Sequence, residues 1–499
     1  MYVALYIYGI VFACYAGSAL GFILSDPWSY GPEMKAHTPE GVRLPVEMYY
    51  EFQTLDHFDG GDFKYWRQRY FVNNATYRPD GPLFLMLHGQ SAANPVWMVT
   101  GAWHEYARQH GALMVMLEHR FFGESQPTDN VTSESLRFLS SRQALADVAS
   151  FVDYIKEFYM YHLKGSKVIV FGGGYAGSLA VWMRSKYPYV VDGAVASSPP
   201  LTAIMDFADY YVGVANSLSS VSPACRANIK TATDTMFEWY GQPEKRSIMN
   251  NIFRLCEKIN HGSLMDLTMF FWRFAENFAR VVQYNKLDLS FMGITNNNVT
   301  MDDVCAIMTD ESLGDPVHRY AAVNSLLLDT DGRQCTNIKY PQLVQSLNQT
   351  TWGSWSAMGG RQRLYQQCSE FGWSRSSWTN KVFNPWFAFP FNFTTDQCID
   401  AFQQIFGGEQ VTDNCAETNR YYGGLNLPVS NVVIVNGAVD PWHRISATGQ
   451  LPNASGDYEV ILLESTSHCA DMLPPMSTDP QELTEARLRI SKHIATWLG

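Results

Sequence analysis

An acid and an imidazole each follow an apolar run near the carboxyl end of the chain. Asp440 comes after the run at 431–435, and His468 comes after the run at 458–463. A carboxylate that holds an imidazole in one tautomer supports a hydrolytic triad, in which the histidine takes a proton from a nucleophilic side chain. Without that third group, Asp440 would be an ordinary turn residue and His468 an ordinary loop residue.

The best position for a nucleophile is a glycine-rich turn after the apolar run at 167–171. It reads Gly-Gly-Gly-Tyr-Ala-Gly from residue 172 to residue 177. A nucleophile on a sharp strand-to-helix turn needs small neighbours, because bulk would clash with the strand and the helix. The residue at the nucleophile position is Gly174, which has no side chain that could attack a carbonyl. Ser178 lies about one helical turn further on, too far for a triad contact.

Strand-like and helix-like segments alternate around this turn. Apolar runs at 83–87, 113–117 and 191–197 are typical of short buried strands, and the stretches between them include segments with helical spacing. This alternation predicts βαβ units and a parallel sheet. The order nucleophile, acid, histidine, with each residue on a loop after a strand, is that of an α/β-hydrolase.

The middle of the chain has a different pattern of secondary-structure signals. Residues 204–424 are helix-rich and lack the alternating pattern, which returns only near residue 431. We therefore predict an α/β fold with an α/β-hydrolase core, formed by residues 25–203 and 425–499. An inserted, mainly helical cap domain is predicted at 204–424.

Residues 1–24 carry no charged side chain and are strongly apolar, with small residues at 16–19. The pattern predicts a cleaved signal peptide and an exported protein, secreted or lysosomal. An uncleaved anchor is the alternative, because the run is long enough to span a bilayer. No second run of that length follows, so we expect no membrane contact after cleavage.

Cysteines and glycosylation signals fit an exported chain. Eight cysteines remain after the leader, which suggests up to four disulfides of unknown pairing. They are Cys225, Cys256, Cys305, Cys335, Cys368, Cys398, Cys415 and Cys469. Six acceptor sequons predict N-glycosylation. Their asparagines are Asn74, Asn130, Asn298, Asn348, Asn392 and Asn453.

The composition excludes several classes of partner. The chain has a net charge of −12, with 46% hydrophobic and 17% charged residues. It has no basic cluster, so nucleic acid is not an expected partner. No cysteine or histidine spacing fits a zinc site, and we expect neither a metal nor another cofactor. The sequence leaves a homodimer open.

Motifs spread along most of the chain resemble one family of serine peptidases. They are Leu55-Asp56-His57-Phe58, Trp66-Arg67-Gln68-Arg69-Tyr70, Leu117-Glu118-His119-Arg120-Phe121-Phe122-Gly123-Glu124-Ser125, Ala144-Leu145-Ala146-Asp147, Tyr365-Gln366-Gln367-Cys368-Ser369-Glu370-Phe371-Gly372, Asn419-Arg420-Tyr421-Tyr422-Gly423-Gly424 and Asp440-Pro441-Trp442. The family holds lysosomal prolylcarboxypeptidase, dipeptidyl peptidase II and the thymus-specific serine protease. The segment at 421–424 is most similar to the thymus-specific branch.

The resemblance implies a capped hydrolase that cleaves short peptides next to proline at acidic pH. It implies that Asp440 is the acid, His468 the base and the backbone N–H of Tyr175 an oxyanion donor, with a second donor from the loop at Gly89. The family elbow reads Gly-Gly-Ser-Tyr-small-Gly, so its serine is missing at Gly174. The family's Gly-Gly-Glu-Gly loop is here His-Gly-Gln-Ser, from residue 88.

Three interpretations follow from the missing serine. The favoured one is a catalytically impaired pseudo-peptidase that binds short, proline-containing peptides. The second is altered hydrolysis, in which His468 and Asp440 activate a water molecule. The third is an ordinary serine exopeptidase, if the glycine is a sequence error; a serine-directed probe would label only that protein.

Two further residues have competing interpretations. Glu370 could hold the amino terminus of a peptide through an ion pair, although a structural or solvated glutamate beside Cys368 is the simpler interpretation. His88 could be catalytic, but a His-Gly pair after a core strand more often supports the oxyanion loop.

Overall fold

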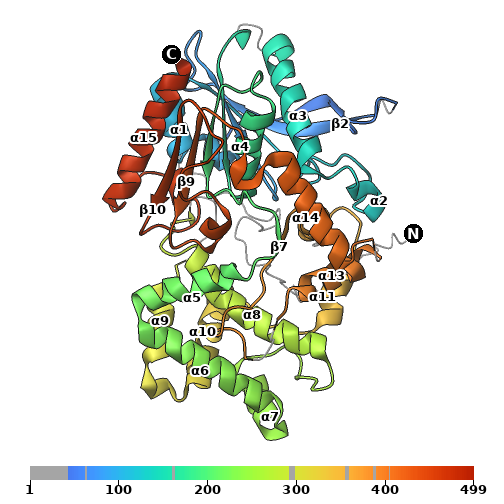
Figure 1. Ribbon diagram of the computed structural model, residues 1–499, viewed down its shortest axis with the longest axis vertical. Coiled ribbons are helices and arrows are strands. Elements are labelled where there is room, and N and C mark those ends of the chain that lie inside the picture. Colours follow the sequence, from blue (N-terminus) through green and yellow to red (C-terminus); the bar gives the residue numbers. More distant parts are fainter. Residues whose placement is uncertain are drawn as a thin grey trace, which may run out of the picture.

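The computed structural model describes residues 43–61, 64–159, 163–290, 298–354, 359–385, 389–403 and 405–499. The predicted signal peptide at 1–24 lies outside these residues. The upper half of the molecule in Figure 1 is built around a sheet, and the lower half consists mainly of helices.

The core is an eight-stranded sheet with the order β1-β2-β4-β3-β5-β6-β9-β10. All strands from β4 to β10 are parallel, whereas β1 and β2 pair antiparallel at one edge. The strands are β1 (Glu47–Thr54), β2 (Tyr65–Asn73), β3 (Leu83–Leu87), β4 (Leu113–Leu117), β5 (Val168–Gly173), β6 (Gly193–Ser197), β9 (Val432–Gly437) and β10 (Tyr458–Leu463). This topology is that of an α/β-hydrolase core, as predicted.

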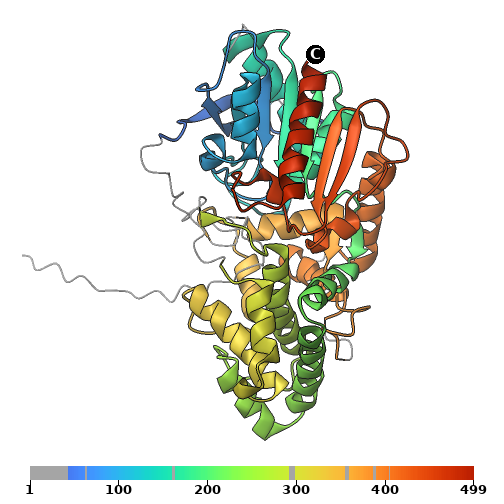
Figure 2. The ribbon, with the colours of Figure 1, turned by 90° about the vertical axis from the view of Figure 1, so that its left-hand side faces the viewer.

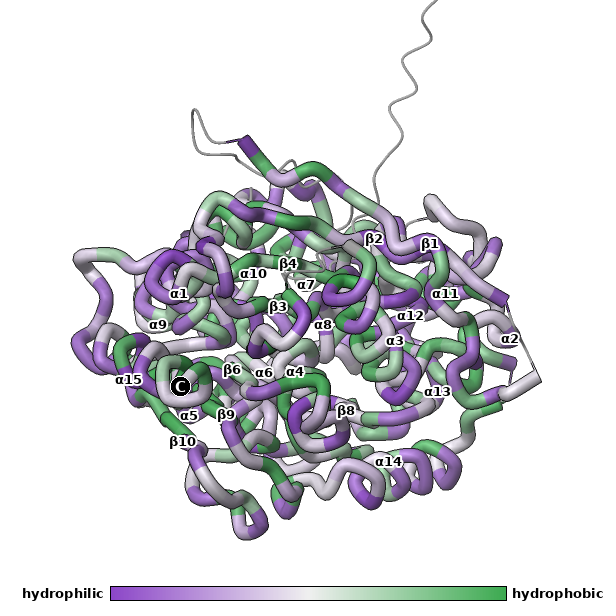
Figure 3. The backbone as a smooth tube through the Cα atoms, turned by 90° about the horizontal axis from the view of Figure 1, so that it is seen from above, coloured by the Kyte–Doolittle hydropathy of each residue, from purple (hydrophilic) through white to green (hydrophobic). Residues whose placement is uncertain are grey.

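Helices cover both faces of this sheet. Helices α1 (Ala102–His110) and α15 (Gln481–Leu498) lie on one face, and α3 (Ser141–Tyr154) and α4 (Tyr175–Lys186) lie on the other (Figure 3). Successive strand side chains alternate between the two layers: Leu85 packs in one apolar cluster and Phe84 in the other. Because both faces are covered, every residue of β3, β4, β6 and β9 is buried, which explains their unbroken apolar runs.

The cap is inserted between β6 and β9 (Figures 1 and 2). It opens with β7 (Ile204–Asp206), which pairs in parallel with β8 (Gly372–Ser374). Its helices are α5 (Asp209–Val221), α6 (Pro223–Tyr240), α7 (Pro243–Ile252), α8 (Leu264–Gln283), α9 (Met301–Thr309), α10 (Pro316–Thr330), α11 (Tyr340–Leu347), α12 (Gly360–Gln366), η8 (Gln367–Phe371), α13 (Asn392–Phe402) and α14 (Gly408–Tyr422). The structure thus confirms an inserted, mainly helical cap.

Three disulfides form, and all of them lie in the cap. They join Cys225 to Cys305, Cys256 to Cys335 and Cys368 to Cys398. The prediction of a disulfide role is wrong for Cys415 and Cys469, which are buried free thiols. The reason is their placement: Cys415 lies on cap helix α14, whereas the Cys469 sulfur faces the end of β6 in the core.

Five of the six sequon asparagines are exposed, and Asn130 is partly buried. Their glycosylation remains a prediction. Within the described ranges, no helix is long and apolar enough to cross a membrane. Across those same residues, no group of three or more His, Cys, Asp and Glu side chains is arranged to hold a metal ion.

Candidate active site

The turn between β5 and α4 has the sharp geometry expected of a nucleophile elbow. Gly174 is its central residue, with φ 57° and ψ −128°, a conformation that strongly favours glycine. The strand and helix approach so closely that a Cβ atom on Gly172 would lie 2.1 Å from the carbonyl oxygen of Ala176. The small residues of the motif are therefore required by the crossing of β5 and α4.

The acid and the histidine meet as the sequence predicted. Asp440 follows β9 and His468 follows β10, and these neighbouring parallel strands end at the same edge of the sheet. Nδ1 of His468 lies 2.6 Å from a carboxylate oxygen of Asp440. The other carboxylate oxygen accepts a hydrogen bond from the backbone N–H of Trp442 at 3.0 Å. Asp440 is fully buried, and these two contacts fix its position.

The environment of His468 favours the imidazolium. Burial lowers its pKa, but the Asp440 carboxylate and the Cys469 thiol override burial and raise the pKa well above its usual value. The backbone N–H of His468 donates to the carbonyl of Gln283 in cap helix α8 at 3.0 Å. A cap contact therefore helps to hold the turn that carries His468.

Gly174 faces the free edge of this imidazole. A Cβ atom built on Gly174 would lie 3.3 Å from Nε2 of His468, with no other atom beyond the ring within 4 Å. Nδ1 is already occupied by Asp440. A serine at this position would place its hydroxyl within reach of the nitrogen that accepts the proton in a triad. The structure thus brings Gly174, Asp440 and His468 together.

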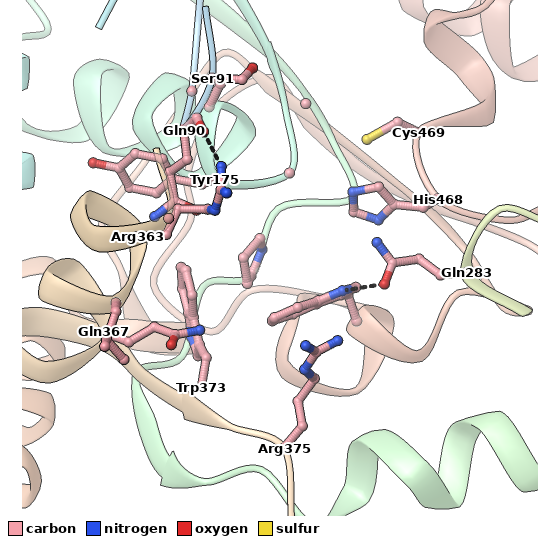
Figure 4. A pocket seen from close by; sticks show the side chains of 18 of the residues that line it. Gln90, Ser91, Tyr175, Gln283, Arg363, Gln367, Trp373, Arg375, His468 and Cys469 are labelled. Carbon is pink, nitrogen blue, oxygen red and sulfur yellow. Dashed lines mark hydrogen bonds between the residues drawn. The ribbon is translucent and has the colours of Figure 1, made fainter. Parts of the chain in front are cut away.

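These residues open into a pocket of about 210 Å³ between core and cap (Figure 4). The core supplies Gly89, Tyr175 and His468 to its wall. Cap elements supply aromatic and polar side chains: Trp272, Gln283, Arg363, Gln367, Trp373, Arg375, Phe393 and Gln397. An apolar pocket with a few convergent polar groups is typical of a ligand site.

The two predicted oxyanion positions lie side by side. A Cβ atom on Gly89 would be 3.5 Å from the backbone nitrogen of Ala176, so the loop after β3 contacts the first turn of α4. Tyr175 is the first residue of α4, and its phenol oxygen accepts a hydrogen bond from Gln366 in the cap at 3.0 Å. The loop and the helix start are therefore close enough to form one anion-binding corner.

His88 and Ser178 have structural surroundings. Burial lowers the pKa of His88 to about 4, and its Nδ1 lies 3.2 Å from the carbonyl of Ser91 in the same loop. A neutral histidine bonded to its own loop fits a scaffold role. Ser178 is fully buried and its hydroxyl donates to the carbonyl of Pro200 at 2.7 Å, so it is not directed at His468.

Glu370 does not line the pocket. One of its carboxylate oxygens accepts hydrogen bonds from the backbone N–H and the hydroxyl of Ser141, at 3.0 and 2.5 Å. Ser141 is the first residue of core helix α3, so this contact joins the cap segment η8 to the core. The geometry favours the structural interpretation of Glu370 over contact with a peptide amino group.

Sequence reasoning missed several pocket residues. Cys469 was assigned to a disulfide, although its position directly after His468 was a signal that it lies at the site. Gln283, Trp373 and Arg375 have no motif of their own, because only the fold of the cap brings them to the pocket.

The fold and this geometry define a capped α/β-hydrolase with the acid–histidine pair of a serine hydrolase. The family model for serine carboxypeptidase S28 matches residues 53–490, and the chain belongs to this family. It is 32% identical over 482 residues to the thymus-specific serine protease of Homo sapiens, covering 92% of this chain and 88% of that protein.

Two further matches are more distant. The lysosomal Pro-X carboxypeptidase of Mus musculus is 25% identical over 488 residues, covering 92% of this chain and 90% of that protein. Among solved structures, the proline iminopeptidase of Mycobacterium smegmatis aligns with a TM-score of 0.39 and 10% identity, over 91% of this chain and 99% of that chain.

Proposed function

We propose that this protein is a peptide-binding member of its peptidase family that has lost serine hydrolysis. One observation carries the proposal: Gly174 holds the elbow geometry and faces Nε2 of His468, yet has no hydroxyl. The Asp440–His468 pair behind it is intact. A scaffold that keeps acid and base without the nucleophile loses the covalent step first.

The pocket supports short peptides as ligands. Its cap wall presents the rings of Trp272, Trp373 and Phe393, which suit a compact apolar residue such as proline. Gln367 and Gln397 offer amide groups to a peptide backbone. Proline-containing peptides also fit the name of one relative, a Pro-X carboxypeptidase.

The proposed location is the lysosome or the extracellular space. Three disulfides support passage through an oxidising compartment. Five exposed sequon asparagines and a relative described as lysosomal are consistent with that route.

The proposal predicts that a serine at position 174 restores hydrolysis. The purified protein and its Gly174→Ser variant would be assayed on Xaa-Pro amides and Pro-Xaa peptides from pH 4 into the alkaline range, because the base must be neutral and the pKa of His468 is raised. Because removal of a triad serine costs on the order of 10⁶ in turnover, a gain of several orders of magnitude is expected. Gly174→Ala is the matched control, since it adds the Cβ without the hydroxyl.

Binding is measured separately from turnover. The tryptophan fluorescence of the unmodified protein should change on titration with proline-containing peptides, since Trp272 and Trp373 line the pocket. Saturable binding without cleavage supports the proposal. Efficient cleavage by the unmodified protein would instead favour water activated by His468. In that case cleavage is lost in His468→Gln and is not regained in Gly174→Ser/His468→Gln.

A further inference from the structure

One cap residue contacts both turns that carry the acid–histidine pair. Gln283 is the last residue of α8, is 3% exposed and lines the pocket between core and cap. Its side-chain oxygen accepts a hydrogen bond from the indole N–H of Trp442 at 3.0 Å, drawn as a dashed line in Figure 4. Its backbone carbonyl accepts a hydrogen bond from the N–H of His468, also at 3.0 Å. Gln283 is therefore bonded to the turn after β9 and to the turn after β10.

The end of α8 supplies the acceptors for the His468 turn. The last four carbonyls of an α-helix have no partner within the helix, and the carbonyl of Gln283 is one of these. Two residues on, the carbonyl of Asn285 accepts a hydrogen bond from the hydroxyl of Ser467 at 2.8 Å. The carboxyl end of a helix also carries partial negative charge, which favours a nearby cation. The helix end therefore holds residues 467–468 at two points and favours the charged form of the imidazole.

Two buried cap tyrosines fix the side chain of Gln283. Its oxygen accepts a second hydrogen bond, from the hydroxyl of Tyr210 at 2.8 Å, and its nitrogen donates to the hydroxyl of Tyr284 at 2.6 Å. The ring of Tyr284 also meets the His468 imidazole edge to face, with 6.0 Å between the ring centres. An indole N–H can only donate, so the amide oxygen must face Trp442. These contacts give Gln283 a single orientation.

We propose that Gln283 is a positioning residue that fixes Asp440 and His468 relative to each other from the cap. On the side of the acid it acts through Trp442, whose backbone N–H donates to the Asp440 carboxylate at 3.0 Å. On the side of the base it acts on the backbone of His468. The geometry of the pair therefore depends on a docked cap. The inference concerns the pair alone, and it holds whether or not the protein binds or hydrolyses peptides.

Gln283 carries no charge, which makes its contribution separable from the electrostatics of the site. His468 interacts electrostatically with Asp440, Cys469 and Asp471, all of which belong to the core. From the cap, the phenol of Tyr284 meets its ring. An uncharged replacement of Gln283 leaves all of these groups in place. A change in the pKa of His468 in such a variant therefore reports a change in geometry.

The test is a proton NMR titration of His468 in protein that contains isotopically labelled histidine. The Nδ1 proton that faces Asp440 should give a low-field resonance, identified by its loss in His468→Gln. Gln283→Leu should broaden or abolish this resonance and lower the pKa of His468 by at least about one pH unit, because the contact with Asp440 loosens. Gln283→Glu keeps acceptor oxygens for Trp442 and Tyr210, so it should retain the resonance.

Gln397→Leu is the matched control. Gln397 is a cap glutamine that lines the same pocket, but its amide donates to the carbonyl of Phe393 within its own helix α13. The same chemical change at this position should leave the resonance and the pKa of His468 unchanged.

Two results would overturn the proposal. One is a folded Gln283→Leu protein, checked by urea unfolding, that keeps the resonance and the pKa of the unmodified protein. The other is an equal effect of Gln397→Leu. If Gln283→Leu does not fold, Trp442→Phe decides, because it removes the indole donor and keeps an aromatic ring. It should broaden the resonance, and an unchanged resonance would overturn the proposal.

Discussion

At the scale of single residues, one missing hydroxyl separates this site from a serine hydrolase. Gly174 has the backbone conformation of the elbow and faces His468, which Asp440 holds through a 2.6 Å contact. Under the proposed function, chemistry at this site depends on which group can use the imidazole: a serine restored at 174 or water. Each of these reactions uses His468 as the base, so the rate of each depends on the charge state of His468.

Asp440 controls that charge state, which gives a prediction for the Gly174→Ser protein. Hydrolysis needs neutral His468, and its raised pKa means that activity should increase as pH rises through that raised value. Gly174→Ser/Asp440→Asn should lose on the order of 10⁴ in turnover, and its pH profile should shift to lower pH because the pKa of His468 falls. Pre-steady-state and pH-rate measurements test both effects.

The control for this prediction is Gly174→Ser/Asp329→Asn. Asp329 is an exposed cap residue that pairs with Arg254. An unchanged pH profile in the Gly174→Ser/Asp440→Asn protein would contradict the role given to Asp440.

At the scale of elements, the crossing of β5 over α4 positions the active-site turn. Gly172 lies where the strand meets the helix, and any side chain there must displace the helix backbone. The mobility of the turn is also limited by Gly174, whose N–H donates to the carbonyl of Ser197 on β6 at 2.9 Å. The site is therefore built on a strand, a helix and the adjoining strand rather than on a free loop.

Gly172→Ala should damage both the fold and the site. The added Cβ would lie 2.1 Å from the carbonyl oxygen of Ala176, so the free energy of unfolding should fall by about 1–3 kcal/mol. Urea unfolding measures this loss, and the activity of a Gly174→Ser background reports any displacement of the elbow. Gly449→Ala is the matched control, since nothing lies within 4 Å of its Cβ. Equal stabilities of the two variants would contradict the packing argument.

At the scale of the whole molecule, several buried polar groups have shifted pKa values, and one of them joins core and cap. Glu370 connects η8 to the start of α3, and burial raises its pKa to about 7. Burial also raises the pKa of Asp471, which accepts a hydrogen bond from Ser197, to about 6. Two histidines shift in the opposite direction: desolvation lowers the pKa values of His88 and His119 to about 4.

The contribution of Glu370 can be isolated with Glu370→Gln. Its folded-state pKa is above its unfolded value, so the folded state binds more protons. The stability it contributes is present below about pH 4.5 and is lost as pH rises through about 7. Relative to the unmodified protein, Glu370→Gln should therefore gain up to about 3 kcal/mol of unfolding free energy between pH 5 and pH 8.

Urea unfolding at the two pH values tests this prediction, with the exposed Glu51→Gln as a control. A difference between Glu370→Gln and the unmodified protein that is the same at both pH values would contradict it.

The sequence by itself determined the fold class and the positions of Gly174, Asp440 and His468. These features depend on short-range chemistry: apolar runs with both sheet faces covered, small residues at a tight turn, and polar residues directly after strands. Because parallel strands end at one edge, the order of segments already implied that the acid and the histidine would meet.

Only the tertiary structure decided which cysteines pair and which distant groups share the pocket. Cys469 counted as one more disulfide candidate until the core placed it against Ser197, away from the cap bridges. Glu370 accepts hydrogen bonds from Ser141, which is 229 residues away in sequence. Such contacts are set by how the cap helices pack on the core, and no local pattern in the sequence encodes that packing.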